Sequence, residues 1–124
     1  MNYFQKVSVW LKTNTQPNEI IYQSSWDIFP LLFYFNHQNY YLNGLDQTFM
    51  YEYNKELYKK WESIWQGKIP LNELSSTIKN DFKSSFVLVE KNTWKTEKML
   101  PLFKRSKDFE KVYEDKEAMI YKIK

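Results

Sequence analysis

Apolar residues recur every three or four positions in several stretches of the chain, the spacing that places them on one side of a helix. The clearest stripe contains Leu57, Trp61 and Ile64. Gly67 is expected to end that helix, because glycine is common directly after a helix C-terminus. The predicted helices cover residues 3–13, 29–35, 53–66, 70–78 and 96–103.

Shorter runs rich in β-branched and aromatic residues separate these helices and predict strands. The run at residues 86–89 is continuously apolar, which is typical of a central strand covered on both faces. The last two runs are joined by a charged turn and predict a C-terminal hairpin. The predicted strands cover residues 19–23, 40–44, 86–89, 109–113 and 118–123.

The alternation of helices and strands predicts the fold class α/β. We expect a mainly parallel sheet of about four or five strands with helices on both faces. This is a Rossmann-like three-layer arrangement, completed here by the C-terminal hairpin. No internal repeat, low-complexity segment or linker divides the sequence, so residues 1–124 are expected to form a single α/β domain.

The amino-acid composition argues against several classes of function. Aromatic residues make up 19% of the 124 residues and glycine only 2 residues, so a folded core is expected rather than disorder. The net charge of +3 is spread along the chain, and Arg105 is its only arginine, which argues against a nucleic-acid partner. With no cysteine, one histidine and no glycine-rich phosphate loop, neither a metal nor a cofactor is expected.

The sequence also bears on membrane association. Its longest apolar run, residues 28–35, is interrupted by Pro30 and falls short of the roughly 20 residues that a transmembrane helix needs. The first residues lack the pattern of a signal peptide. Taken alone, the chain is therefore expected to be soluble and cytosolic. Taken as a piece of a larger protein, it does not indicate where in the cell that protein is located.

Polar and aromatic residues follow the first two predicted strands. Trp26 and Asp27 come after the first, and Asp46 and Tyr51 come after the second. Ligands usually bind at the C-terminal ends of parallel strands, so these side chains would face one crevice if the two strands are neighbours. Aromatic rings stack on apolar sugar faces and carboxylates accept hydroxyl hydrogen bonds, which suits a sugar. Asn39, in the turn before the second strand, completes this expected substrate-binding set.

Structural roles for the same residues stay open. Asp27 suits the N-cap of the helix predicted after it, and Trp26 suits a place in the core. Asp46 lies near Gly44 and suits a turn. Two carboxylates can also serve a glycosidase, but the sequence does not fix the separation between Asp27 and Asp46.

Three groups of short strings resemble one class of protein. They are WLKTNT at residues 10–15 with EIIY at 19–22 and WDIFP at 26–30, then NHQNYYLNGLDQTF at 36–49, then VYEDKEAMIY at 112–121. Together they span nearly the whole chain. They resemble the C-terminal soluble domain of GT-C-type membrane glycosyltransferases, the protein mannosyltransferase-like and oligosaccharyltransferase-like proteins.

The resemblance implies an extracytoplasmic domain of a larger membrane protein. Its partner would be the membrane-embedded portion of the parent, together with a glycan or acceptor. In such enzymes the catalytic acidic residues and the lipid-linked donor site belong to the membrane portion, so this chain would not transfer sugar alone.

This chain departs clearly from one motif of that family. The oligosaccharyltransferase catalytic subunit has a Trp-Trp-Asp-Tyr-Gly motif that helps to hold the acceptor peptide. This chain resembles it only at Trp26 and Asp27, because Ser25 replaces the first Trp and Ile28 and Phe29 replace Tyr-Gly. Recognition of a peptide acceptor therefore does not carry over.

Two other interpretations compete with the glycosyltransferase one. The first is a free-standing module that binds glycan or protein through exposed aromatic residues. The second is a small hydrolase that uses Asp27 and Asp46.

Overall fold

The computed structural model describes residues 4–17, 19–23, 40–41, 55–91 and 94–124. The helices within these ranges are α1 (Gln5–Asn14), α4 (Lys55–Trp65), α5 (Leu71–Ser76), the π-helical turn η2 (Thr77–Asp81) and α6 (Trp94–Arg105). The strands are β1 (Ile20–Gln23), β2 (Tyr40–Tyr41), β3 (Ser84–Glu90), β4 (Phe109–Glu114) and β5 (Ala118–Ile123).

These elements confirm most of the predicted ones. The helix predicted from Pro70 begins as expected, but its second half is the π-helical turn η2. The strand predicted at residues 40–44 is described only at 40–41, and the helix predicted at 29–35 lies outside the described residues.

The strands form one five-stranded sheet with the order β2-β1-β3-β5-β4. β1 pairs in parallel with both β2 and β3, whereas β5 pairs antiparallel with both β3 and β4. Four strands therefore share one direction and β5 alone is reversed. β4 and β5 form the predicted C-terminal hairpin.

The expectation of a mainly parallel, Rossmann-like sheet is thus only partly correct, because the sheet is mixed. The physical reason lies in the hairpin. Helix α6 carries the chain past one strand position to β4 at the sheet edge, and the tight turn after β4 returns the chain into the gap as β5. A hairpin strand must run antiparallel to its partner.

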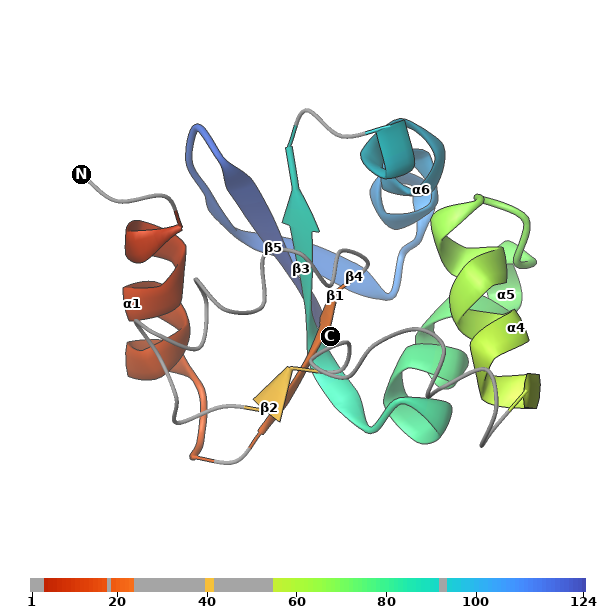
Figure 1. Ribbon diagram of the computed structural model, residues 1–124, viewed down its shortest axis with the longest axis horizontal. Coiled ribbons are helices and arrows are strands. Elements are labelled where there is room, and N and C mark those ends of the chain that lie inside the picture. The colour runs from red at the N-terminus through yellow and green to blue at the C-terminus, as the bar shows by residue number, and fades with distance from the viewer. Residues whose placement is uncertain (1–3, 18, 24–39, 42–54, 92–93) are drawn as a thin grey trace.

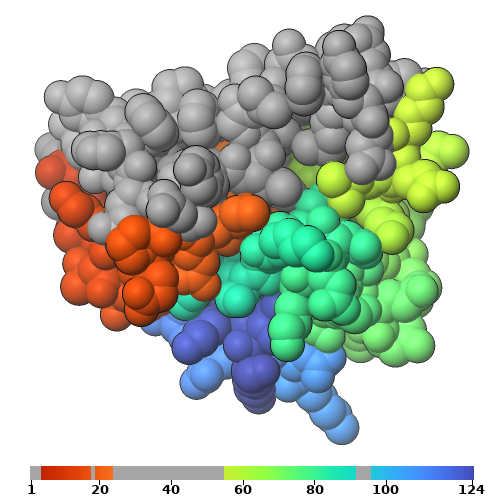
Figure 2. Space-filling model, turned by 90° about the horizontal axis from the view of Figure 1, so that it is seen from below, coloured from red at the N-terminus to blue at the C-terminus, as the bar shows by residue number. Residues whose placement is uncertain are grey.

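Helices cover both faces of the sheet (Figure 1). α1 lies on one face, and α4, α5 and α6 lie on the other. Figure 2, seen from below, shows α1 and the α4–α5 pair on opposite sides of the strands. The central strands alternate between the two sides accordingly: Ile21 of β1 packs toward α1 and Tyr22 toward α4, both fully buried.

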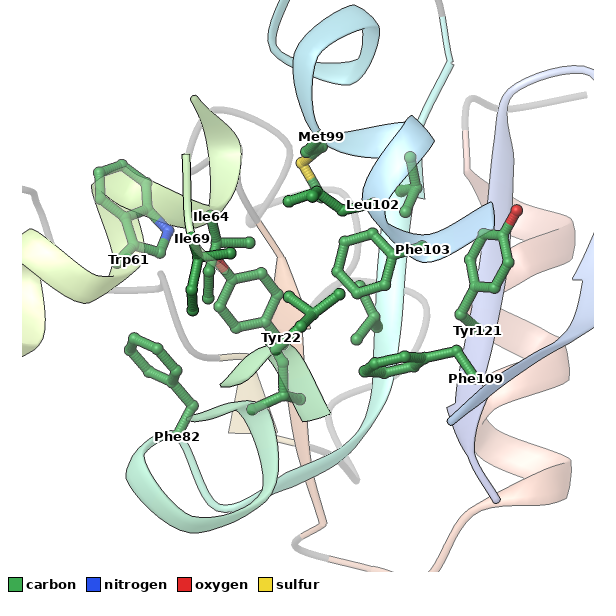
Figure 3. Packing of buried hydrophobic residues seen from close by; sticks show 14 of the residues in the cluster. Tyr22, Trp61, Ile64, Ile69, Phe82, Met99, Leu102, Phe103, Phe109 and Tyr121 are labelled. Atoms are coloured by element: carbon green, nitrogen blue, oxygen red, sulfur yellow. The ribbon is translucent and has the colours of Figure 1, made fainter. Parts of the chain in front are cut away.

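The larger core lies between the sheet and α4, α5 and α6 (Figure 3). Trp61, Phe82 and Phe103 are among its fully buried side chains. Phe103 meets Phe109 edge to face at 5.0 Å between ring centroids, which joins α6 to the hairpin.

The smaller core lies under α1. Val7 and Leu11 are buried against Leu88 of β3 and Ile120 of β5, as the helical stripe predicted, while Trp10 is only half-buried. The N-terminal end of α1 is also tied to the hairpin turn, because the backbone N–H of Phe4 donates to the Glu117 carboxylate at 3.0 Å.

Gly67 ends α4 as predicted. Its φ of 74° is the left-handed conformation that glycine adopts most easily. The N–H of Gly67 donates to the Ile64 carbonyl at 3.0 Å, and the N–H of Lys68 donates to the Ser63 carbonyl at 2.8 Å. This pair of bonds is a Schellman motif, which satisfies the last free carbonyls of the helix.

Candidate functional site

The carboxyl ends of the parallel strands form the candidate site. β1 lies between β2 and β3, with Ile21 opposite Tyr41 and Gln23 opposite Leu88. The first two predicted strands are therefore neighbours, which was the condition for a shared crevice. Chain segments that leave β1 and β2 start from the same edge of the sheet, where α/β folds commonly bind ligands.

Gln23, the last residue of β1, is the most unusual polar group at this edge. Its side chain is only 1% exposed, and it points to the α1 side because Ile21, two residues earlier, does so. Neither its Oε1 nor its Nε2 has a hydrogen-bond partner in the part of the chain that the structure describes. A buried polar group without a hydrogen-bond partner lowers the free energy of unfolding by about 1–3 kcal/mol, so the Gln23 carboxamide destabilises the domain when nothing is bound to it.

Glu90 ends β3 on the same face as Gln23. It lies two residues beyond Leu88, the register partner of Gln23, and its side chain is half-buried. Its backbone carbonyl accepts a hydrogen bond from the Thr96 hydroxyl, which fixes the start of α6 to the end of β3. A carboxamide and a carboxylate therefore share one face at the ends of adjacent strands.

Trp61 fixes the end of β1 from the other side of the sheet. Its indole N–H points to the backbone carbonyl of Gln23 at 3.4 Å, and its ring meets Trp65 at 6.3 Å between centroids. Trp61 belongs to α4 and is only 1% exposed, so its indole N–H contacts the Gln23 backbone from the buried side of that helix. The Gln23 side chain faces α1, on the other side of the sheet.

Tyr22, which precedes Gln23 in β1, places a second buried polar group on the opposite face of the sheet. Its ring meets Phe82 edge to face at 5.2 Å, and its hydroxyl lies among the apolar residues in Figure 3. That hydroxyl has no hydrogen-bond partner within the described ranges. Burial raises the pKa of Tyr22 well above its usual value, so the hydroxyl stays neutral.

Replacing Tyr22 by phenylalanine is expected to raise the free energy of unfolding by about 1 kcal/mol, because the unsatisfied hydroxyl disappears while the ring packing stays. Urea denaturation measures the change. Tyr113→Phe is the matched control and should lose stability, since the Tyr113 hydroxyl donates to Asp115. A loss of stability in Tyr22→Phe would show that this hydroxyl has a partner after all.

The densest charge cluster belongs to the hairpin and not to this edge. Glu114 accepts from Lys91 at 2.7 Å and from Lys111 at 2.6 Å. The hydrogen bond from Lys111, followed by that from Lys91, lowers the pKa of Glu114 to about 2. These ion pairs join the end of β3 to β4 and keep the Glu114 carboxylate ionised.

The five sequence-predicted site residues all lie outside the described residues. They are Trp26, Asp27, Asn39, Asp46 and Tyr51. The structure describes the edge from which the segments with Trp26, Asp27, Asp46 and Tyr51 depart, whereas Asn39 precedes the first residue of β2. Sequence reasoning missed Gln23, the uncharged polar residue that ends a run of three apolar ones.

The described ranges contain neither a candidate metal site nor a candidate membrane span. No group of three or more His, Asp or Glu side chains within them is arranged to hold a metal ion. None of the helices described is both long and apolar enough to cross a membrane. Comparison of the chain with models of known protein families, with curated proteins and with solved structures gives no match.

Proposed function

We propose that this chain is an extracytoplasmic domain of a membrane glycosyltransferase-like protein. In this proposal the carboxyl edge of β1 and β2 supports binding of a glycan or acceptor, and the domain is not catalytic alone. The membrane-embedded portion of the parent would supply the donor site and the catalytic acids. The glycosyltransferase part of the proposal rests on the sequence strings quoted above.

The observation that supports binding at this edge is the buried carboxamide of Gln23. Its two polar atoms have no partner within the described ranges, at the strand ends where α/β folds bind ligands. A carboxamide donates through Nε2 and accepts through Oε1, so it matches a hydroxyl or an amide, which also do both. Sugars and peptide acceptors carry these groups, which makes either a suitable ligand.

Trp26 and Asp27 would complete the site. They follow Gln23 by three and four residues, so they belong to the segment that leaves this edge. In the proposal, the Trp26 ring stacks on a sugar face, the Asp27 carboxylate accepts hydroxyl hydrogen bonds, and Gln23 orients a further hydroxyl.

A size measurement tests the membrane origin first. Antibody raised against the chain is used to probe fractionated source cells. The proposal expects a band far larger than 15.3 kDa, the mass of this chain, in the membrane fraction. A soluble band near 15.3 kDa would reject the membrane parent and leave a free-standing binding module.

Variants of the parent test the site. Asp27→Ala should lower sugar transfer roughly 10-fold or more, because a hydrogen bond to a charged group contributes about 1.5–3 kcal/mol and 1.4 kcal/mol is tenfold. Trp26→Ala should also lower transfer, because it removes the stacking surface. Gln23→Leu should lower transfer less than Asp27→Ala, because a neutral hydrogen bond contributes about 0.5–1.5 kcal/mol. Transfer is measured in membranes that contain equal amounts of each protein.

The same Gln23→Leu change separates binding from folding. In the isolated chain it should raise the midpoint of urea unfolding, because it removes two unsatisfied buried polar atoms. A stabilised domain with impaired transfer supports a ligand role for Gln23. Unchanged transfer in all three variants would remove the proposed site.

A further inference from the structure

A second concave surface lies between α1 and β4, away from the carboxyl edge of β1. β4 is the last strand of the order β2-β1-β3-β5-β4, so β3 and β5 separate it from β1. The groove has a volume of about 610 Å³, within the range of about 300–1,000 Å³ that ligand sites usually have. Its lining residues are Gln5, Lys6, Val9, Trp10, Thr13, Asn14 and Tyr113.

The floor of the groove is a fixed aromatic surface. The Trp10 ring is held between Tyr113 at 5.6 Å and Phe86 at 6.1 Å, measured between ring centroids. The Tyr113 hydroxyl donates to Asp115, which holds the second ring in place. Val9, 50% exposed, extends the apolar surface beside Trp10. These ring contacts position the indole in the groove.

The rim of the groove carries uncharged hydrogen-bonding groups and one cation. The Asn14 Nδ2 donates to the Trp10 carbonyl at 2.8 Å, which leaves Oδ1 as an acceptor. The Thr13 hydroxyl donates to the Val9 carbonyl at 2.9 Å and keeps its lone pairs. Gln5 and Lys6 add a carboxamide and an ammonium group, and no carboxylate is among the lining residues described.

We propose that this groove binds a carbohydrate chain, with one sugar ring stacked on Trp10. A sugar ring has an apolar C–H face and a rim of hydroxyls, and the groove offers an aromatic floor with carboxamides around it. The half-buried side chain of Gln5 and the exposed side chain of Asn14 bind the hydroxyls. Lys6 supplies the one charged group among the lining residues that the structure describes, and its ammonium favours a sugar that carries a carboxylate.

A protein partner fits this groove less well. Stable protein interfaces use about 20–30 residues a side, whereas seven of the residues that the structure describes line the groove. Only three of those seven, Val9, Trp10 and Tyr113, are apolar or aromatic, and polar side chains border them along α1. Such a surface suits a small amphipathic ligand better than a helix or a second copy.

The test measures the NMR chemical shift of the Trp10 indole N–H in the isotope-labelled chain during titration with sugars. The probes are maltotriose and chitotriose as neutral sugars and trigalacturonate as an acidic one. We expect a saturable shift of the Trp10 signal with at least one probe, and tighter binding of the acidic one. Lys6→Gln should remove that preference and leave neutral binding within twofold.

Variants separate binding from folding. Trp10→Ala should weaken binding at least 10-fold, but Trp10 also packs on Phe86, so this variant can lose stability. Gln5→Ala and Asn14→Ala avoid that problem and should each weaken binding about threefold or more. Asn72→Ala, an exposed asparagine on α5, is the matched control and should bind like the unchanged chain.

Two results would overturn the proposal. One is the absence of any Trp10 shift with all three sugars at tens of millimolar. The other is a Trp10 shift that depends on protein concentration without sugar, which would assign the groove to self-association. The groove shares no residue with the carboxyl-edge site, so the two proposals fail separately: loss of the Trp10 shift removes the groove alone, and unchanged transfer in the parent variants removes the carboxyl-edge site alone.

Discussion

Trp61→Ala is expected to lower the free energy of unfolding by about 3–5 kcal/mol, the usual cost of truncating a fully buried Trp. The Trp61 side chain is 1% exposed and packs between Tyr58 and Trp65, at ring-centroid distances of 5.6 and 6.3 Å. Small domains have a total stability of about 5–15 kcal/mol, so this loss removes a large share. Urea denaturation followed by circular dichroism measures it.

Trp61→Phe is the matched control. It keeps an aromatic ring but loses the indole N–H that points to the Gln23 carbonyl at 3.4 Å. We expect a loss of about 1–2 kcal/mol, well below that of the alanine variant, because one long hydrogen bond and part of the ring volume disappear. Equal losses in both variants would mean that the hydrogen bond, and not the packing, dominates at this position.

Gly67→Ala is expected to cost about 2–5 kcal/mol, for two reasons that add. A side chain at φ 74° must adopt the left-handed conformation, which costs about 1–2 kcal/mol. In addition, a Cβ at this position would lie 2.4 Å from the backbone carbonyl oxygen of Lys98 on α6. Backbone cannot move aside as a flexible side chain can, so α4 and α6 must separate, and such overpacking costs about 1–3 kcal/mol. Thermal unfolding measures the effect.

Gly67→Asn distinguishes the two causes. Asparagine tolerates the left-handed conformation better than other residues that carry a Cβ, so strain alone would make this variant mild. Its Cβ meets the same Lys98 carbonyl, so we expect a loss close to that of alanine. A mild asparagine variant beside a severe alanine one would show that the contact with α6 relaxes easily.

Local patterns predicted the elements well because each carries its own signal. The stripe at residues 53–66 and the stop at Gly67 became α4 and its Schellman motif. The continuous apolar run at 86–89 became β3, which is covered on both faces. The place of β5 in the sheet, and with it the mixed strand direction, was harder to predict. The residues of β5 do not indicate whether it pairs with both β3 and β4 or with β4 alone.

The site itself stays a prediction, whereas the neighbouring positions of its two strands are confirmed. The pairing of β1 with β2 confirms that the two segments chosen from the sequence leave the same edge of the sheet. Gln23 was missed because a single polar residue at a strand end usually reaches solvent, and only the packing around it shows that it is 1% exposed. Burial is a property of the assembled layers, so a linear pattern cannot report it.

The place of β5 in the sheet has a consequence for synthesis on the ribosome. β5 follows β4 in the chain, yet it lies between β3 and β4. Until Ile123 has left the exit tunnel, β4 has no neighbour and one side of β3 is open, so the nascent chain presents an unpaired strand edge. The sheet therefore cannot be completed before β5 has emerged, and the interval before that is when the nascent chain is most exposed to aggregation.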